Sequence, residues 1–261
     1  MDLSIIIVNW NTRDMLRDCL ASLPAATEGL ATEVLVVDNA SADGSAAMVT
    51  DEFPAVRLIE SGGNLGFSRG NNLALTRASG RGLLLLNPDT ICPPASLARL
   101  YRFMNGRTDV GAVGPRLVDG EGFPTISGGY FPRTRFHWFG CLDPWRLWLR
   151  GPLARRVSFI PTRQDPSHRV EYVMGACFLF PRTALERLEG LDERFFMYFE
   201  ETDWCYRARQ AGLDVWFCAE TEITHLEGRS AEQASRFSIT QFQRSYRLFV
   251  AKHHGRWAVW G

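Results

Sequence analysis

Several common patterns are missing from this 261-residue sequence, and each absence removes a class of protein. The six cysteines form no CxxC pair and the five histidines form no HExxH pattern, so neither a disulfide framework nor a zinc site is indicated. No apolar run approaches the roughly 20 residues of a membrane-spanning helix. No basic stretch precedes the first apolar run, as it would in a signal peptide. We therefore expect a cytoplasmic protein with reduced, mostly buried thiols.

An excess of charge of either sign is missing as well. Lys+Arg 29 and Asp+Glu 29 leave a net charge of +0, so no overall field favours nucleic acid as a partner. The composition is 46% hydrophobic and 22% charged, which is ordinary for a globular protein with a real core. At this length the chain could be one large domain or one domain with an appendage.

The most informative stretch is residues 83–89, with the sequence LLLLNPD. Four consecutive leucines after Gly82 are typical of a short strand that is buried on both faces. Pro88 cannot donate to a sheet and disfavours helical angles at Asn87, so the strand ends there. Asp89 is then presented at the carboxyl end of a central strand, where open α/β sheets bind their ligands. A carboxylate in this position suits a divalent cation, and a bound cation suits a phosphate.

Apolar strands and amphipathic helices alternate from residue 3 to residue 118. The expected strands cover 3–8, 33–37, 56–60, 83–86 and 110–118, and the expected helices cover 13–23, 45–53, a segment ending near 78, and 94–105. This alternation predicts a doubly wound, mostly parallel sheet with right-handed crossovers. Because the carboxyl ends of parallel strands share one edge, polar residues at those ends should line one rim: Asn9, Asp38, Asn64, Asn87 and Asp89.

Residues 119–170 show no regular pattern. They are too many for an ordinary loop and too aromatic for a disordered linker. Tryptophans alternate there with arginines: Trp138, Trp145, Trp148, Arg146, Arg150, Arg155 and Arg156. Such a surface favours the interface of an anionic membrane, but large aromatic side chains also commonly pack inward over a core. A lid, an acceptor-binding insertion and a membrane-surface patch all remain open for this segment.

Regular patterns return after residue 170. A strand is expected over 171–180, a helix from about 182, another helix from Glu200, a strand over 214–219 and a long helix over 231–252. His225 would stand in the loop after the last of these strands. Three acids, Glu200, Glu201 and Asp203, begin the second helix. Their spacing predicts that Glu200 and Asp203 share one helical face while Glu201 points elsewhere.

Each motif has an ordinary structural explanation when it is taken alone. The glycine-rich loop at 61–72 matches neither a P-loop nor G-x-G-x-x-G, which counts against ATPases and dinucleotide enzymes. The acids at 200–203 could be a solvated first helical turn, because acids complement the helix dipole. The polar cluster at 38–44 could supply turn and cap chemistry, and His225 could be a loop histidine. Specificity comes from the order of the motifs.

Taken in order, the motifs resemble the family 2 inverting glycosyltransferases of GT-A fold, and among them the rhamnosyltransferase-like members. The succession is Asn9-Trp10-Asn11, VDNASADG at 37–44, Asn64-x-Gly66-Phe67, Gly70-Asn71-Asn72, Leu86-Asn87-Pro88-Asp89, Gly175-Ala176, FEETDWCYR at 199–207, and His225. The resemblance covers nearly the whole chain apart from about 119–169.

For the donor, the resemblance implies a site on the rim. Asn9 and Asn11 would lie beside the nucleotide, with Asp38 on its base or ribose. Asn64 and Asn71 would lie on the same side.

For the metal and the chemistry, Asn87-Pro88-Asp89 takes the place of the DxD motif of the family. The resemblance implies that Asp89 binds Mg²⁺ or Mn²⁺ bridging the donor diphosphate, with His225 close by, although Asn87 lowers the charge of the ligand set. Glu200-Glu201 takes the place of the Glu-Asp pair whose second member is the usual base. Glu201 is therefore the first choice for the base, and Glu200 and Asp203 are the alternatives.

The overall expectation is a single α/β domain of GT-A type. Residues 1–118 would bind the nucleotide sugar, 119–170 would form an irregular acceptor-side insertion, and 171–261 would bind the acceptor and carry the base. A sugar such as the deoxyhexose rhamnose would move from a nucleoside diphosphate to a glycan or polyprenyl-linked acceptor, in the cytoplasm or at the inner face of a membrane.

Two alternatives stand beside this expectation. A nucleotidyltransferase should carry a basic, glycine-rich loop after its first strand, and Asn9-Trp10-Asn11 is neither basic nor glycine-rich. A non-catalytic sugar-nucleotide or glycan-binding module would not need Asp89, Glu201 and Asp203 together.

Overall fold

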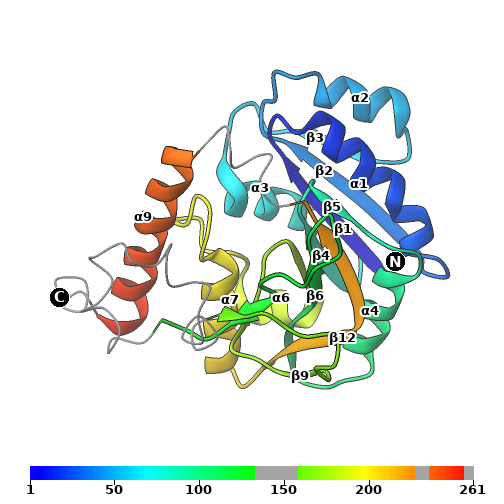
Figure 1. Ribbon diagram of the computed structural model, residues 1–261. Helices are drawn as coiled ribbons and strands as arrows, with labels where there is room; N and C mark the ends of the chain where they lie inside the picture. The colour runs from blue at the N-terminus through cyan, green and yellow to red at the C-terminus, as the bar shows by residue number, and fades with distance from the viewer. Residues whose placement is uncertain (133–157, 227–234, 256–261) are drawn as a thin grey trace.

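The computed structural model describes residues 1–132, 158–226 and 235–255 (Figure 1). The predicted membrane-surface or lid segment around Trp138–Arg156 lies outside these residues. Through the first half, strands and helices alternate as predicted: β1 (Leu3–Asn9), α1 (Arg13–Ala26), β2 (Thr32–Asp38), α2 (Ser45–Glu52), β3 (Arg57–Glu60), α3 (Gly66–Leu75), β4 (Gly82–Leu86), β5 (Thr90–Ile91), α4 (Ser96–Asn105) and β6 (Val110–Val118).

The second half contributes shorter strands and three helices within the described ranges. They are β7 (Gly128–Gly129), β8 (Ser158–Phe159), β9 (His168–Arg169), β10 (Tyr172–Val173), β11 (Cys177–Pro181), α6 (Arg182–Leu188), α7 (Glu200–Gln210), β12 (Asp214–His225) and α9 (Ser235–His254).

The described strands form one main sheet, in the order β3-β2-β1-β4-β11-β6-β12-β5, with β9 paired to β12. β3, β2, β1 and β4 are mutually parallel. β11 runs antiparallel between β4 and β6, and β12 runs parallel to β6. The sheet is therefore mostly parallel, as expected. Since β11 comes from the second half of the chain, both halves build a single sheet.

Alternate residues of the central strands enter two separate cores, because successive side chains of a strand point to opposite faces. Ile5, Ile7 and Leu84 pack with α1, α2 and α4 on one face. Ile6 and Leu85 pack with α3, α6 and α7 on the other face. Every residue of β4 is buried, which confirms the reading of the leucine run. The helices cover both faces of the sheet (Figure 1).

Two predicted elements differ from the structure. The strand expected over 171–180 breaks at Gly175, because Val173 pairs with Gly128 in a small antiparallel sheet while Cys177 pairs with Leu86 in the main sheet. The strand expected over 214–219 continues, after a bulge, through His225. His225 is therefore the last residue of β12 and not a loop residue.

The cysteines and the helices bear on two expectations from composition. Five of the six cysteines lie in the described residues, and all five are buried free thiols, as predicted. Among the helices of the described ranges, none is long and apolar enough to cross a membrane.

Candidate active site

The Asn-Pro-Asp turn after β4 is held at the rim by two neighbouring strands. The Asn87 backbone N–H donates to the carbonyl of Ala176, just before β11, at 2.9 Å. His225 at the end of β12 pairs with Thr90 of the two-residue strand β5. Asp89 lies between these anchored positions, so its carboxylate is fixed close to His225.

Asp89 and His225 face each other at the carboxyl ends of β4 and β12. His225 Nε2 lies 3.3 Å from Asp89 Oδ1 and 3.4 Å from Asn87 Nδ2. Asp89 Oδ1 is buried and accepts no hydrogen bond from the described part of the chain. A buried carboxylate oxygen without a donor is costly unless a cation compensates it. This oxygen is therefore the atom best placed to hold a cation.

The donor set at this turn fits a metal that binds together with a phosphate. No group of three or more His, Cys, Asp or Glu side chains in the described ranges forms a complete metal cage. Mg²⁺ commonly takes only one or two carboxylates and completes its coordination with water and substrate phosphates. Asp89, with Asn87 and His225 beside it, meets that limited requirement.

Asn9 and Asp38, at the ends of β1 and β2, are buried and bonded to protein groups. Asn9 Nδ2 donates to Asp38 Oδ1 at 3.2 Å and to Ser41 Oγ at 3.1 Å. Asn9 Oδ1 accepts from Thr12 Oγ1 at 2.6 Å. The Asn9 side-chain amide therefore holds the ends of β1 and β2 together through hydrogen bonds. Asp38 Oδ2 accepts from the Ser41 N–H, but a carboxylate has further lone pairs for a ligand hydroxyl.

The three other predicted asparagines divide into two exposed residues and one buried residue. Asn11 and Asn64 are exposed at the rim, and each accepts a backbone N–H through Oδ1, from Ala42 and Gly66 respectively. Asn71 is buried in α3 and donates within that helix. Asn71 therefore stabilises the helix beside the rim, whereas the exposed side chains of Asn11 and Asn64 can reach a ligand.

Trp10 is a rim residue that the sequence motifs contained but did not assign. Its indole is 47% exposed, between the buried Asn9 and the exposed Asn11. An exposed indole face beside a nucleotide site can stack on a base. The signal for it in the sequence was a large aromatic residue placed immediately after a fully buried strand.

The glycine-rich loop touches the segment that leads into α7. The Phe67 N–H donates to the carbonyl of Phe196 at 2.7 Å. Gly66 has a φ of 79°, and a Cβ there would lie 2.5 Å from the same carbonyl oxygen. Only glycine fits this close approach. The contact places the start of α3 against the loop that leads into α7.

Glu200 and Glu201 begin α7 beside the break between β10 and β11. A Cβ on Gly175 would lie 3.7 Å from Cγ and Cδ of Glu201. The next residue, Ala176, accepts the hydrogen bond from Asn87. The dipeptide Gly175-Ala176 therefore lies between the Glu201 carboxyl and the turn that carries Asp89.

Burial raises the pKa of both glutamates. For Glu201, whose Oε2 atom is buried without a hydrogen bond from the described residues, it raises the pKa to about 7. For Glu200, which is buried, it raises the pKa well above the ordinary range, and the neighbouring charge of Glu201 raises it further. At neutral pH Glu200 therefore keeps its proton, whereas Glu201 can take up or release one.

The Asp203 carboxylate is held by three neighbouring side chains. Its fully buried carboxylate accepts from Lys252 Nζ at 2.6 Å, from His253 Nε2 at 2.7 Å and from Arg207 Nε at 2.8 Å. Burial alone would raise the pKa of Asp203, but these partners lower it. Two of these partners, Lys252 and His253, come from α9 and cannot be inferred from the local sequence.

A family model described as glycosyl transferase family 2 matches residues 4–189. An N-acetylglucosaminyl-diphospho-decaprenol L-rhamnosyltransferase of Mycobacterium tuberculosis is 29% identical over 268 residues, covering 98% of this chain and 86% of that protein. The low-salt glycan biosynthesis hexosyltransferase Agl10 of Haloferax volcanii is 27% identical over 256 residues, covering 95% of this chain and 72% of that protein.

Solved glycosyltransferases share the fold at low sequence identity. A mannosyltransferase of Pyrobaculum calidifontis in complex with GDP-Man and Mn²⁺ aligns with a TM-score of 0.65 and 19% identity, over 96% of this chain and 64% of that chain. GalNAc-T7 with UDP, GalNAc and Mn²⁺ aligns with a TM-score of 0.67 and 16% identity, over 96% and 47%. This chain thus spans less than two thirds of either solved chain. The family match, the curated relatives and the shared GT-A fold show that this chain belongs to glycosyl transferase family 2 and is a rhamnosyltransferase-like glycosyltransferase.

Proposed function

We propose that the chain is a metal-dependent, inverting glycosyltransferase that uses a nucleoside diphosphate sugar as donor. The observation that carries this proposal is the arrangement around Gly175-Ala176. On one side lies Asp89, with a buried oxygen suited to a cation. On the other side lies Glu201, with a pKa of about 7. A cation site and a titratable carboxylate are the two features that direct transfer from a sugar diphosphate requires.

The Glu201 carboxylate acts as the base in this proposal. It accepts the proton of the acceptor hydroxyl while the hydroxyl oxygen forms a bond to the anomeric carbon, and the bond from that carbon to the diphosphate breaks. A pKa near 7 suits a group that must be ionised yet basic at neutral pH. One displacement by one nucleophile inverts the configuration at the anomeric carbon.

Asp89 would hold the metal, with Asn87 and His225 beside it. When bound there, Mg²⁺ or Mn²⁺ would neutralise the charge that develops on the leaving diphosphate. Asp38, Asn11 and Asn64 would contact the nucleotide, with Asn9 and Asn71 holding the rim in shape. We add Trp10 to this set as a stacking surface for the base.

Asp203 has a supporting role in this proposal. Its carboxylate is held by Arg207, Lys252 and His253, so it cannot readily accept a proton from an acceptor. It fixes the first turn of α7 and thereby the position of Glu201.

The proposed donor sugar is a deoxyhexose such as rhamnose, and the proposed acceptor is a sugar on a polyprenyl diphosphate, within cell-envelope polysaccharide synthesis. The name of the M. tuberculosis relative supports both parts, because that protein is described as a rhamnosyltransferase acting on a diphospho-decaprenol sugar.

A donor screen tests the function. Purified protein is mixed with Mn²⁺ and a panel of nucleotide sugars, and thermal stabilisation identifies the donor. Transfer to an acceptor is then followed by NMR, in which an inverted anomeric configuration is expected. Retained configuration would overturn the inverting mechanism, and a complete lack of stabilisation and transfer across the panel would overturn the proposed donor class.

A further inference from the structure

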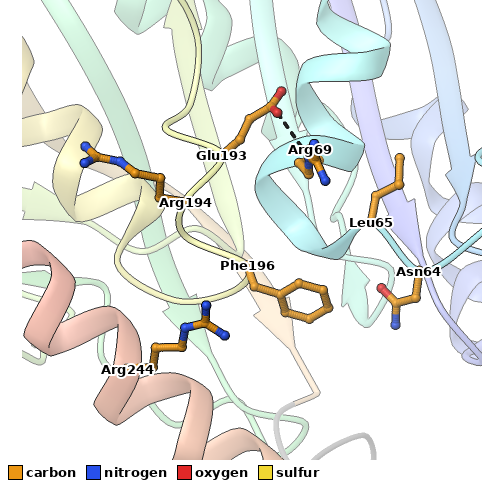
Figure 2. A pocket seen from close by; sticks show the side chains of 7 residues that line it. All are labelled: Asn64, Leu65, Arg69, Glu193, Arg194, Phe196 and Arg244. Carbon is orange, nitrogen blue, oxygen red and sulfur yellow. Dashed lines mark hydrogen bonds and ion pairs between the residues drawn. The ribbon is translucent and has the colours of Figure 1, made fainter.

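A shallow pocket of about 370 Å³ lies outside the Asp89 turn, where three separate elements meet (Figure 2). The start of α3, the loop before α7 and the middle of α9 supply its lining, which consists of Asn64, Leu65, Arg69, Glu193, Arg194, Phe196 and Arg244. The loop that supplies Glu193, Arg194 and Phe196 leads into α7, whose first residues are Glu200 and Glu201.

One guanidinium in this pocket is uncompensated. Arg69 Nε pairs with Glu193 at 3.1 Å, and Arg194 pairs with Asp192 at 2.6 Å. Arg244 is exposed and has no acceptor in the part of the chain that the structure describes. In Figure 2 its side chain extends toward Phe196, whereas Arg194 points away from that ring. Arg69 is 59% exposed and bonds Glu193 only through Nε, so its two terminal nitrogens remain available as well.

The charge and shape of these groups fit a phosphate. A planar guanidinium fork matches two oxygens of a phosphate and stays charged at any ordinary pH. With two of the three arginines neutralised by carboxylates, the pocket keeps a net positive charge from Arg244. A phosphate or diphosphate is therefore the anion class that it would bind.

An apolar surface continues from Arg244 along α9. Phe237 precedes Arg244 by seven residues, about two helical turns, and therefore lies on the same face of the helix. Its ring is 45% exposed and meets Phe196 edge to face, with the centroids 6.0 Å apart. An anion site followed by an exposed aromatic ring on the same helix face suits a ligand with a phosphate head and a hydrocarbon tail.

We propose that Arg244, with Arg69, binds the diphosphate of a lipid-linked acceptor, and that Phe237 contacts the first part of its hydrocarbon chain. The inference rests on the proposed function, because it assumes an acceptor sugar joined to a polyprenyl diphosphate. The donor diphosphate is a different ligand. It would belong to the turn at Asp89, and of the residues that line this pocket only Asn64 is one that we also place beside the nucleotide.

A binding measurement tests the site without relying on transfer. Farnesyl diphosphate is titrated into the protein in EDTA, so that binding which depends on a metal at Asp89 is suppressed. We expect Arg244→Gln to weaken this binding about ten- to hundredfold, the usual contribution of a hydrogen-bonded charge. Arg102→Gln, which changes an exposed arginine on the distant α4, is the matched control and should bind as the wild type does.

Two further variants separate the parts of the ligand. Phe237→Ala should weaken farnesyl diphosphate but leave inorganic pyrophosphate unchanged, which distinguishes a lipid ligand from a free anion. Glu193→Gln removes the carboxylate that competes for Arg69, so it should tighten binding of both probes. Unchanged melting temperatures show that each variant remains folded.

An activity measurement separates failure of this inference from failure of the proposed function. Transfer is compared between farnesyl-diphospho-N-acetylglucosamine and octyl N-acetylglucosaminide, which lacks the diphosphate. Arg244→Gln should lose its preference for the diphosphate acceptor while it keeps transfer to the octyl glycoside. If wild-type protein does not bind farnesyl diphosphate, or if Arg244→Gln binds it equally well, the site does not exist, whether or not the enzyme transfers sugar. If binding depends on Arg244 but no sugar is transferred, the anion site stands and the proposed function fails.

Discussion

At the scale of single residues, two carboxyl groups at the start of α7 differ in how they hold a proton. Glu200 is buried beside Glu201, which raises its pKa well above the ordinary range. For Glu201, burial raises the pKa only to about 7. The difference assigns the exchangeable proton to Glu201 and makes Glu200 a neutral neighbour.

The first prediction concerns this pair. Glu201→Gln should lower turnover roughly 10²–10⁴-fold, the usual contribution of a general base, while donor binding survives. Glu200→Gln is the matched control and should keep most activity, because an amide resembles the protonated acid that it replaces. The steady-state transfer rates of the two variants, compared with the wild type, test this prediction. Comparable losses in both variants would contradict the division of roles.

The second prediction is the pH dependence of the wild type. Glu201 must be ionised to accept a proton, and its raised pKa means that ionisation occurs at a higher pH than for an ordinary carboxyl. The transfer rate should therefore rise with pH up to about 7 and level off above it. A rate already at its plateau at pH 5 would mean that the base has an ordinary carboxyl pKa and is not Glu201.

The third prediction concerns Asp89. Asp89→Asn keeps the shape of the side chain but removes its charge, so Mn²⁺-dependent nucleotide binding and transfer should be lost together. Far-UV circular dichroism and the melting temperature should remain close to those of the wild type. Full activity of this variant, or of the wild type in EDTA, would exclude Asp89 as the principal metal ligand.

At the scale of elements, α9 anchors the helix that carries Glu201. Lys252, the single lysine of the sequence, reaches Asp203 at 2.6 Å and Asp192 at 2.7 Å. Ser245 Oγ donates to the Met197 carbonyl at 2.7 Å. The loop before α7 and the first turn of α7 are thus both tied to α9.

The fourth prediction follows from this anchor. Lys252→Met should destabilise the protein by about 1–3 kcal/mol, because a buried carboxylate loses a charged hydrogen-bond donor. Arg247→Gln, an exposed change on the same helix, is the control and should have little effect.

The pH dependence of the anchor has a defined sign. Burial raises the pKa values of Asp203 and Asp192, but hydrogen bonds from Lys252 and other donors more than offset this, so both are lowered. A carboxyl group whose pKa is lowered in the folded state stabilises the fold fully at pH values above its unfolded-state pKa of about 3.9. This stabilisation is lost as the pH falls through the lowered pKa of the folded state. Urea unfolding should therefore show the full difference between Lys252→Met and wild type at pH 7. The difference should shrink well below pH 4, and a constant difference down to pH 2 would contradict the anchor.

At the scale of the whole molecule, the two halves of the chain share one sheet. β11 lies between β4 and β6, and its residues pair with Gly82–Leu86, the full length of β4. A fragment of residues 1–118 alone would therefore lack β11, the strand that pairs with β4 on that side. The two halves of the chain should therefore fold as one unit.

The fifth prediction tests this unity. Leu85→Ala, on the buried strand β4, should destabilise the protein by about 2–5 kcal/mol, as is usual for a fully buried leucine. The shift should appear equally in tryptophan fluorescence and in circular dichroism, because one cooperative transition involves both halves. Separate transitions for the two probes would show that the halves unfold independently.

Local sequence was sufficient for the doubly wound first half and for the position of the Asn87-Pro88-Asp89 turn. The leucine run with Asn87-Pro88-Asp89 contains its own signals, since burial on both faces and a proline stop are local properties. The alternation of strands and helices up to residue 118 likewise depends on short-range patterns, and the structure follows it closely.

The tertiary structure decided which acids are free, where His225 lies and where a second anion could bind. Asp203 and Glu201 look equivalent in sequence, but α9 places Lys252 and His253 on Asp203 and leaves Glu201 beside Gly175. The pocket at Arg244 joins residues from three segments of the chain. Such long-range contacts depend on how helices pack on the sheet, and no local pattern encodes them.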